Sequence, residues 1–430
     1  MIEIISTLEK ERLAARLQCI RERNVALDSA LIGYVASILN EVRLGGDAAL
    51  VDYAAQFDGH QMEAAELRVD EEVLRQIATR VDNEVLGALR EVICRVRFFH
   101  ECEREMSWAT DGSNGVHLGQ RITPIERVGL YVPGGTASYP SSVVMNVVPA
   151  QVAGVDRIIV ATPPGALQQN PAVAAALVEL NVLEVYATGG AQAIAALAYG
   201  TETVPKVDKI TGPGNRYVAA AKKLVFGIVG IDSLAGPSEV IVIADETARP
   251  SFIASDLLAQ AEHSEDAAAI LVTTSEELAV AVTREMVQQI SALSRAEVIE
   301  KSLSRYGTVI IAKDMEEACA LVNELAPEHL EIMARDESVI AARIVNVGAI
   351  FFGEHTPEVV GDYLAGPNHV LPTSGAARFS SALSVHDFVK RTSTVKFSVE
   401  ELQKTAQMIA ALARSEGLDA HAQSALIRFL

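Results

Sequence analysis

The sequence predicts an α/β fold with mostly parallel sheets, a helical N-terminal segment and a helical C-terminal tail. From about residue 125, short β-branched runs alternate with Ala-rich helical segments, and glycines and prolines separate them. This alternation is typical of parallel strands joined by helical crossovers. Before about residue 105, apolar residues instead recur at three- and four-residue spacing, which is typical of helices.

The elements can be justified in order along the chain. The N-terminal part is represented by the helical pattern LIGYVASILNEV, and the first strands are RVGLYV, DRIIVAT and LEVYATG. A break near DSLAGPSEV (232–240) precedes a second set of strands, SEVIVIAD, AAAILVTT, GTVIIAK and VGAIFFG, so we expect two αβ halves. After Lys390 comes a helix-like tail. Because it cannot bury its apolar stripe alone, we expect it to pack on the body or on another subunit.

Composition excludes several classes of protein. The chain has 430 residues, half of them hydrophobic and 21% charged, which indicates a globular protein of about two to four domains. Its formal net charge is −20 and it has no basic run, so a nucleic-acid partner is not expected, whereas a small cationic substrate would be tolerated.

Targeting and redox signals point to the cytoplasm. The N-terminus lacks the apolar core of a secretory signal, and the most apolar region (141–162) is broken by Pro149, Asp156 and Arg157, so no membrane span is expected. The four cysteines form no CxxC pair, which predicts buried free thiols in a reducing compartment. These cysteines are Cys19, Cys94, Cys102 and Cys319.

The usual glycine fingerprint of a dinucleotide site is missing. GPGNRY (212–217) supplies two of the three glycines, and TGGAQAIAALAYG has the wrong spacing. The second strand ends in Thr162-Pro163-Pro164, where an acidic residue that binds ribose would be expected. Each glycine loop is equally compatible with a structural turn and with a phosphate site at a helix N-terminus.

The distribution of histidines suggests a metal site. Six of the nine histidines follow residue 260, and Gln260 and His263 would project from one face of a helix. Asp362 lies in a turn-rich segment and His421 in the tail. Such nitrogen and oxygen ligands suit a catalytic or substrate-binding metal more than a structural one, although the spacing alone also allows a purely structural role.

The segment APEHLE (326–331) offers two groups that could transfer protons. Pro327 suits the start of a helix, with Glu328 and Glu331 in its first turn. Alternatively, Glu328 and His329 are an acid–base pair; adjacent residues reach one cleft together only from a loop or a helix end. Two further positions stay open: Ser238 as a cap or ligand, and Tyr131 as a core or stacking residue. PGGTASYPSS is expected to be a loop before a helix, with Pro140 at the start of that helix.

Eight segments in series resemble the histidinol dehydrogenase family. They are ERVGLYVPGG, GGAQAIAALAYGT, KITGPGNRYV, LAGPSEV, DLLAQAEH, APEHLE, GDYLAGPNHVLPT and EGLDAHA. The resemblance implies oxidation of L-histidinol to L-histidine through L-histidinaldehyde, the last step of histidine biosynthesis. It also implies two NAD⁺ per turnover, one Zn²⁺ per subunit, and a homodimer.

The resemblance also implies two Rossmann-like αβα domains. Residues 126–238 would form the NAD-binding domain, and residues 26–125 would pack with 239–380 as the domain holding the zinc and catalytic residues. Residues 1–25 would form a helical arm, and residues 381–430 a dimerisation tail that contributes to the partner subunit.

Site residues are implied one by one. The catalytic pair would be Glu328 and His329, and the zinc ligands Gln260, His263, Asp362 and His421. Substrate would contact these ligands, His329, and also Ser238, His369 and Glu416; NAD⁺ would contact Tyr131, Gln192 and Asn215. Two alternatives are a relative acting on another small alcohol, which Ser238, His369 and Glu416 disfavour, and a non-catalytic metal-binding scaffold, which Glu328 and His329 disfavour.

Overall fold

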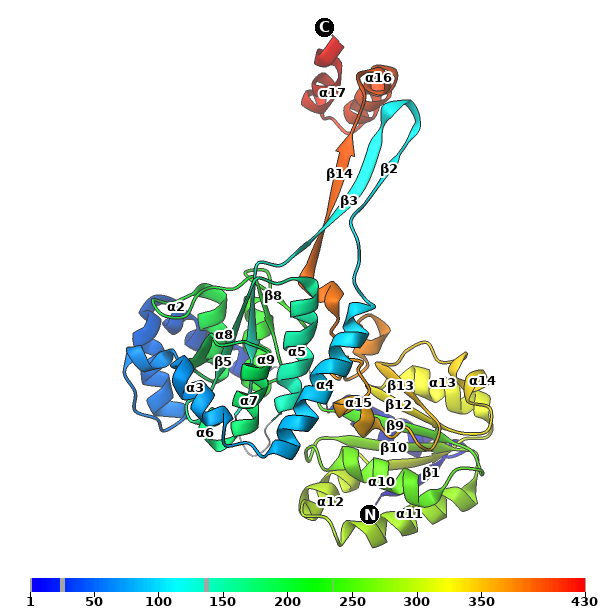
Figure 1. The fold of residues 1–430 in the computed structure, drawn as a ribbon. Coiled ribbons are helices and arrows are strands. Elements are labelled where there is room, and N and C mark those ends of the chain that lie inside the picture. Colours follow the sequence, from blue (N-terminus) through cyan, green and yellow to red (C-terminus); the bar gives the residue numbers. More distant parts are fainter. Residues whose placement is uncertain (1, 24–27, 135–138, 235, 430) are drawn as a thin grey trace.

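Two αβ lobes and a stalk that carries the C-terminal helices make up the molecule (Figure 1). The structure is a computed structural model that describes residues 2–23, 28–134, 139–234 and 236–429. The α/β class with mostly parallel sheets, expected from the alternating pattern, is confirmed.

The first lobe is built on a parallel sheet with the order β6-β5-β4-β7-β8. Its strands are β4 (Arg127–Tyr131), β5 (Arg157–Thr162), β6 (Val185–Ala187), β7 (Lys209–Thr211) and β8 (Gly230–Ile231). The helices between them are α5 (Pro140–Ala153), α6 (Ala166–Gln169), α7 (Pro171–Glu179), α8 (Gly190–Tyr199) and α9 (Arg216–Val225). The first strand of this sheet, β4, lies in the middle: β5 and β6 are added on one side of it, and β7 and β8 on the other. This reversal of strand order opens a crevice at the carboxyl ends of β4 and β7.

The second lobe has a parallel sheet with the order β1-β11-β10-β9-β12-β13. Its strands are β1 (Glu3–Ser6), β9 (Glu239–Ala244), β10 (Ala268–Thr273), β11 (Thr308–Ile311), β12 (His329–Met333) and β13 (Ala349–Phe352). Its helices include α10 (Pro250–Ala261), α11 (Glu276–Ile290), α12 (Ala296–Arg305), α13 (Met315–Leu325), α14 (Glu337–Ala341) and α15 (Glu358–Tyr363). In this sheet the amino ends of β9 and β12 face the first lobe. This is seen from the residues at the start of these strands, which line one pocket together with first-lobe residues.

The N-terminal arm belongs to the second lobe and is not wholly helical. Strand β1 pairs with β11, and α1 (Lys10–Arg21) buries Leu13, Leu17 and Ile20 in the core of the same sheet. The strand was missed because four residues carry little periodic signal. The predicted boundary near residue 25 lies outside the described residues.

The grouping of residues 26–125 with 239–380 is corrected by the packing. Helix α2 (Ser29–Phe57) packs on α8 and α9, α3 (Glu71–Ala78) on α7, and α4 (Asn83–Glu101) on α5, all in the first lobe. The apolar stripe of a helix predicts that one face is buried, but it does not identify the sheet that buries it.

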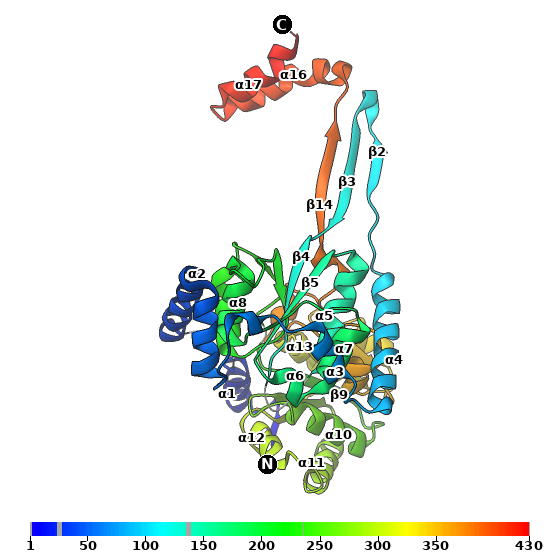
Figure 2. The ribbon, with the colours of Figure 1, turned by 60° about the vertical axis from the view of Figure 1, so that its left-hand side comes forward.

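A three-stranded antiparallel stalk leaves the lobes and ends in the tail (Figures 1 and 2). Strand β14 (Val389–Lys396) pairs with β3 (His117–Pro124), which pairs with β2 (Trp108–Asp111). The segments 26–125 and 381–430 are therefore not purely helical. Beyond the stalk, α16 (Val399–Ser415) and α17 (Asp419–Leu426) pack on each other through small residues, Ala410, Ala413 and Ala422.

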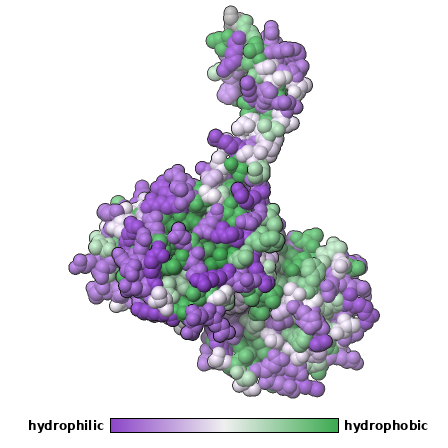
Figure 3. Space-filling model, in the orientation of Figure 1, coloured by the Kyte–Doolittle hydropathy of each residue, from purple (hydrophilic) through white to green (hydrophobic). Residues whose placement is uncertain are grey.

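The tail and the stalk leave large apolar side chains exposed, and Figure 3 shows hydrophobic residues on the visible face of the tail. The exposed side chains are Trp108, Val395, Phe397, Val399, Met408, Ile409, Leu412, Leu418, Ile427 and Phe429. Clusters of exposed apolar side chains are typical of interaction surfaces.

Two further expectations can be compared with the structure. All four cysteines are free, but Cys19, Cys94 and Cys102 are exposed and only Cys319 is buried, so the expected burial was wrong for three of them. No helix among the described residues is both long enough and apolar enough to cross a bilayer.

Candidate active site

Two adjoining pockets lie at the facing edges of the two sheets. We call the first the crevice pocket; its volume is about 580 Å³, and the residues lining it follow the carboxyl ends of β4, β5, β6 and β7 or belong to α2 and its C-terminal end. We call the second the inter-lobe pocket; its volume is about 350 Å³, and residues from both lobes line it. Pro133 and Asn215 line both pockets, so the two spaces meet there.

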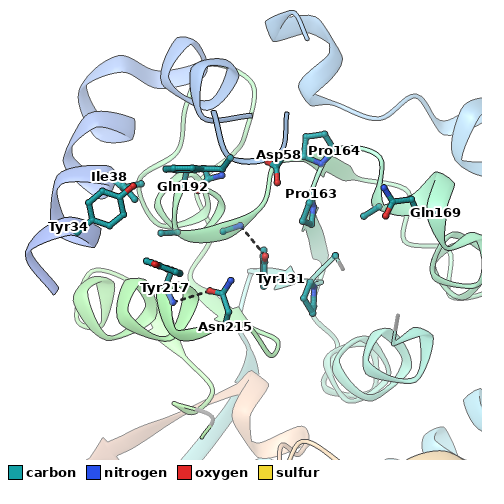
Figure 4. A pocket seen from close by; sticks show the side chains of 16 residues that line it. Tyr34, Ile38, Asp58, Tyr131, Pro163, Pro164, Gln169, Gln192, Asn215 and Tyr217 are labelled. Carbon is teal, nitrogen blue, oxygen red and sulfur yellow. Dashed lines mark hydrogen bonds between the residues drawn. The ribbon is translucent and has the colours of Figure 1, made fainter. Parts of the chain in front are cut away.

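All three residues predicted to contact NAD⁺ line the crevice pocket (Figure 4). Tyr131 ends β4, and its hydroxyl oxygen accepts a hydrogen bond from the Gly190 N–H at 3.0 Å. Burial raises the pKa of Tyr131 to about 12, so the phenol stays neutral. Asn215 caps α9, accepting from the Tyr217 N–H at 3.0 Å, and Gln192 lies buried in the first turn of α8.

Two helices begin at the crevice pocket, although the chain lacks the usual glycine fingerprint. Helices α8 and α9 both begin at the pocket, so their unpaired N–H groups and positive dipole ends favour an anion there. Gly212 has a φ of 113°, and a Cβ at that position would lie 2.1 Å from the Tyr131 carbonyl oxygen, so this glycine is required by the turn itself.

Several lining residues were not predicted from the sequence. Tyr34, Asp58 and Tyr217 face the crevice pocket, with Asp58 at the C-terminal end of α2 (Figure 4). An acidic side chain thus lines this pocket, but it comes from the end of a helix that precedes the sheet and not from the segment after β5. In the sequence, Asp58-Gly59 reads only as a turn.

The inter-lobe pocket brings together six of the residues predicted for catalysis, metal binding or substrate binding: Ser238, His263, Glu328, His329, Asp362 and His369. Glu416 and His421 lie instead on the tail at the far end of the stalk (Figures 1 and 2). Within one chain, the pocket therefore contains only part of the predicted set.

Glu328 and His329 reach the pocket from the start of a strand. His329 is the first residue of β12, so the expected helix at residues 327–331 was wrong, and Glu331 is buried in that strand. The neighbouring strand β9 holds both side chains: the Glu239 N–H donates to Glu328 Oε2 at 3.1 Å, and His329 Nδ1 lies 3.2 Å from the Glu239 carbonyl oxygen. Because a carbonyl oxygen can only accept, Nδ1 carries the proton and Nε2 is left as the basic nitrogen.

Burial shifts the acid–base properties of this pair in opposite directions. It raises the pKa of Glu328 to about 8, with the charge of Glu239 as a further cause. It lowers the pKa of His329, which favours the neutral imidazole. A neutral imidazole beside a carboxyl group that titrates near physiological pH can accept protons in two different steps.

The predicted metal ligands in this chain lie on two neighbouring helices. Gln260 is in the last turn of α10, His263 follows that helix, and Asp362 is in α15. Asp362 lies between two imidazoles: its Oδ2 is 4.0 Å from His263 Nε2, and its Oδ1 is 3.6 Å from His369 Nδ1. Burial alone would raise the pKa of Asp362, but the nearby imidazole of His369 and the charges of the other histidines hold the pKa below its usual value.

The surroundings of Gln260 fit a divalent cation. Its side chain is fully buried, and neither its amide nitrogen nor its amide oxygen has a hydrogen-bond partner. Buried polar groups are nearly always paired, so an orphaned amide oxygen suits a missing ligand. Within the described part of the chain, no three His, Cys, Asp or Glu side chains converge in a metal-binding arrangement, so this set needs the amide and a ligand from elsewhere.

Replacing Gln260 with methionine is expected to abolish zinc binding without lowering the free energy of unfolding of the metal-free protein. The change removes a buried, unpaired amide, whose burial costs about 1–3 kcal/mol, and keeps the side-chain volume. Urea unfolding of metal-free protein and metal analysis check this. As a control, Asn368→Leu should lower the unfolding free energy, because the Asn368 amide donates to the Met145 carbonyl oxygen at 2.6 Å. A metal-free Gln260→Met protein that is as destabilised as Asn368→Leu would contradict the assignment.

Comparisons with known proteins agree in one family. A family profile described as Histidinol dehydrogenase matches residues 21–429. A histidinol dehydrogenase of Geobacillus kaustophilus is 52% identical over 395 residues, 92% of this chain and 93% of the relative, and one of a Synechococcus strain is 48% identical over 432 residues, 100% and 99% of the two chains. The crystal structure of histidinol dehydrogenase from Elizabethkingia anophelis matches with a TM-score of 0.92 at 33% identity, covering 99% of this chain and 98% of that one.

Proposed function

We propose that this chain, which belongs to the histidinol dehydrogenase family, oxidises L-histidinol to L-histidine through L-histidinaldehyde. The reaction would use two NAD⁺ and take place in the two adjoining pockets. The family inferred from eight sequence segments is confirmed by the comparisons. The observation that best supports the proposed chemistry is the position of the Glu328/His329 pair in a pocket that meets the crevice at Asn215.

The cofactor would occupy the crevice pocket. Tyr131, Gln192 and Asn215 would contact it, and the first turns of α8 and α9 would face its diphosphate. Because Asn215 lines both pockets, the nicotinamide end would lie toward the inter-lobe pocket. NAD⁺, when bound, supplies the hydride acceptor for both oxidations.

Zinc would be held by Gln260, His263 and Asp362 of one subunit and by His421 of the partner subunit. When bound, it would hold the imidazole and amine of the substrate, and so fix the position of the carbinol carbon. Ser238 and His369 would contact the substrate from the same chain, and Glu416 of the partner subunit from the tail. His369 is already oriented, since its Nε2 lies 3.5 Å from Ser142 Oγ and its Nδ1 faces Asp362.

In the first oxidation, His329 would act as the base. Its Nε2 accepts the hydroxyl proton while hydride leaves the carbinol carbon, which gives the aldehyde. The fixed Nδ1–H keeps the basic nitrogen on the other side of the ring from the Glu239 carbonyl oxygen. A lowered pKa keeps this imidazole unprotonated and able to accept.

In the second oxidation, Glu328 would act on water. The aldehyde carbon must gain an oxygen before hydride can leave again. The carboxylate accepts a proton from the attacking water, the new C–O bond forms, and hydride then leaves the hydrated carbon to give the acid. The Glu239 N–H holds Glu328 Oε2, which leaves Oε1 as the oxygen for this proton.

Two features of the tail support the proposed homodimer with shared sites. Its apolar side chains are uncovered in one chain, and His421 and Glu416 lie far from the pocket of their own chain (Figures 1 and 2). A second copy of the chain would cover that face and receive those two residues at its own inter-lobe pocket.

An assay with purified, zinc-loaded protein tests the proposed function. Adding L-histidinol and NAD⁺ should produce two NADH per histidinol, with one zinc per chain by metal analysis. A Glu328→Gln/His329→Asn double variant, purified in the same way, controls for contaminating enzymes of the host. The proposal fails if zinc-loaded protein forms no NADH in response to histidinol.

The pH dependence of aldehyde oxidation should follow Glu328. Its pKa of about 8 leaves most of the carboxyl protonated at pH 7, and a protonated carboxyl cannot accept a proton from water. The rate should therefore increase about tenfold per pH unit below pH 8 and level off above it. Glu328→Asp should keep a rising limb of this kind, whereas Glu328→Gln should lose it. A rate that already levels off at pH 5 to 6 would contradict the raised pKa.

A further inference from the structure

A buried ion pair lies directly behind the Glu328/His329 pair. The Arg23 guanidinium donates to Glu239 Oε2, and the two side chains are only 2% and 8% exposed. The guanidinium also donates to main-chain oxygens, to Ile20 through Nε at 2.8 Å and to Asp266 through Nη1 at 2.9 Å. Glu239 Oε1 accepts from the Ser374 N–H at 3.0 Å. All three guanidinium nitrogens and both carboxylate oxygens thus have hydrogen-bond partners.

Glu239 is also the residue whose backbone orients both proposed proton acceptors. Its N–H donates to Glu328 Oε2 at 3.1 Å, and its carbonyl oxygen accepts from His329 Nδ1 at 3.2 Å. Arg23 Nη1 additionally lies 3.4 Å from the carbonyl oxygen of Ser238, another residue of the inter-lobe pocket. Any shift of Glu239 would therefore misplace both proton acceptors together.

The place of Arg23 along the chain adds to this arrangement. It ends the arm whose helix α1 packs in the second lobe, whereas the next described helix, α2, packs in the first lobe. Arg23 thus anchors the chain at the point where it leaves the second lobe. Its ion-pair partner, Glu239, is 216 positions away in the sequence. A buried ion pair is weak support for stability, because well-packed apolar residues often stabilise as well or better. The position of the Arg23–Glu239 ion pair next to the proposed proton acceptors explains its presence better than a contribution to stability does.

We propose that Arg23 is a positioning residue for the reaction: through its ion pair with Glu239 it holds the start of β9, and thereby orients Glu328 and His329. Neither Arg23 nor Glu239 lines the inter-lobe pocket. This inference rests on the proposed function, since Glu328 and His329 must be the proton acceptors for their orientation to matter.

The test compares Arg23→Met with an Arg23→Met/Glu239→Gln double variant. The single variant leaves a buried carboxylate unpaired and should lose stability, whereas the double variant removes that charge and should regain most of the midpoint of urea unfolding. We expect kcat to stay about tenfold to a hundredfold below wild type in both variants. KM values for histidinol and NAD⁺ and the zinc content should stay near wild type, because no ligand contact is lost.

Two further variants separate positioning from a general effect of the arm. Arg23→Lys keeps the charge without the forked geometry and should recover part of kcat. Arg12→Met breaks the exposed ion pairs of Arg12 with Glu3 and Glu9 in the same arm and should leave kcat unchanged. A double variant with wild-type kcat would overturn the positioning role. Wild-type protein in the same assay gives the reference: if it forms no NADH from histidinol, the proposed function fails instead.

Discussion

Replacing Glu328 with glutamine is expected to slow the oxidation of supplied L-histidinaldehyde by about a hundredfold or more, and to slow the oxidation of L-histidinol to the aldehyde much less. Only the second oxidation adds water, so only that step needs the carboxylate as a base. Glutamine can still accept the hydrogen bond from the Glu239 N–H, which keeps the side chain in place. Single-turnover measurements of NADH formation from each substrate separate the two steps.

His329→Asn is the matched variant for the first oxidation. It should slow proton removal from the alcohol, since the asparagine amide has no basic nitrogen to replace Nε2. In Glu328→Gln, by contrast, histidinol should give close to one NADH rapidly and the second slowly. Equal slowing of both half-reactions by Glu328→Gln would show that the division of roles between the two residues is wrong.

Mixing two inactive variants, His329→Asn and His421→Ala, is expected to restore roughly a quarter of wild-type activity once subunits exchange. If the tail of each chain completes the site of its partner, a mixed dimer collects both defects in one site and leaves the other site whole. Random pairing makes half of the dimers mixed, and each mixed dimer has one working site of two. Activity of the mixture before and after exchange gives the result.

A second mixture, His329→Asn with Glu328→Gln, provides the control. Both residues lie in the inter-lobe pocket of their own chain, so every site in a mixed dimer keeps one defect. Steady-state turnover of L-histidinol to L-histidine, the activity compared in both mixtures, should therefore not rise on exchange. Exchange can be followed independently with chains of different mass. If exchange occurs and the first mixture stays as inactive as the second, His421 does not act in the partner's site.

The sequence predicted the strands that are buried on both faces. RVGLYV, DRIIVAT and AAAILVTT became β4, β5 and β10 because continuous apolar runs leave few alternatives. Strand β12 was missed: Pro327 and Glu328 favour a helix start locally, but pairing with β9 and β13 prevails. The stalk strands gave no signal, since β14 and β2 are exposed on both faces and so lack an alternating pattern.

The site was predictable only where its residues lie close together in the chain. The spacing of Gln260 and His263 indicated one helix face, and the family resemblance supplied the more distant members. Arg23, Asp58 and Glu239 were not predicted, because each acquires its role from a contact between segments far apart in the sequence. No local pattern encodes such contacts, which depend on how the two sheets and the arm assemble.

The opposite orientation of the two sheet edges has an electrical consequence. On the first-lobe side, α8 and α9 present their N-termini, whose partial positive charge suits a diphosphate. On the second-lobe side, α10 and α13 end just before His263 and Glu328, so their C-termini direct partial negative charge toward the same space. If the reactants bind as proposed, the backbone alone would separate them by charge, with the anionic cofactor on one side and the cationic amino alcohol and its metal ion on the other.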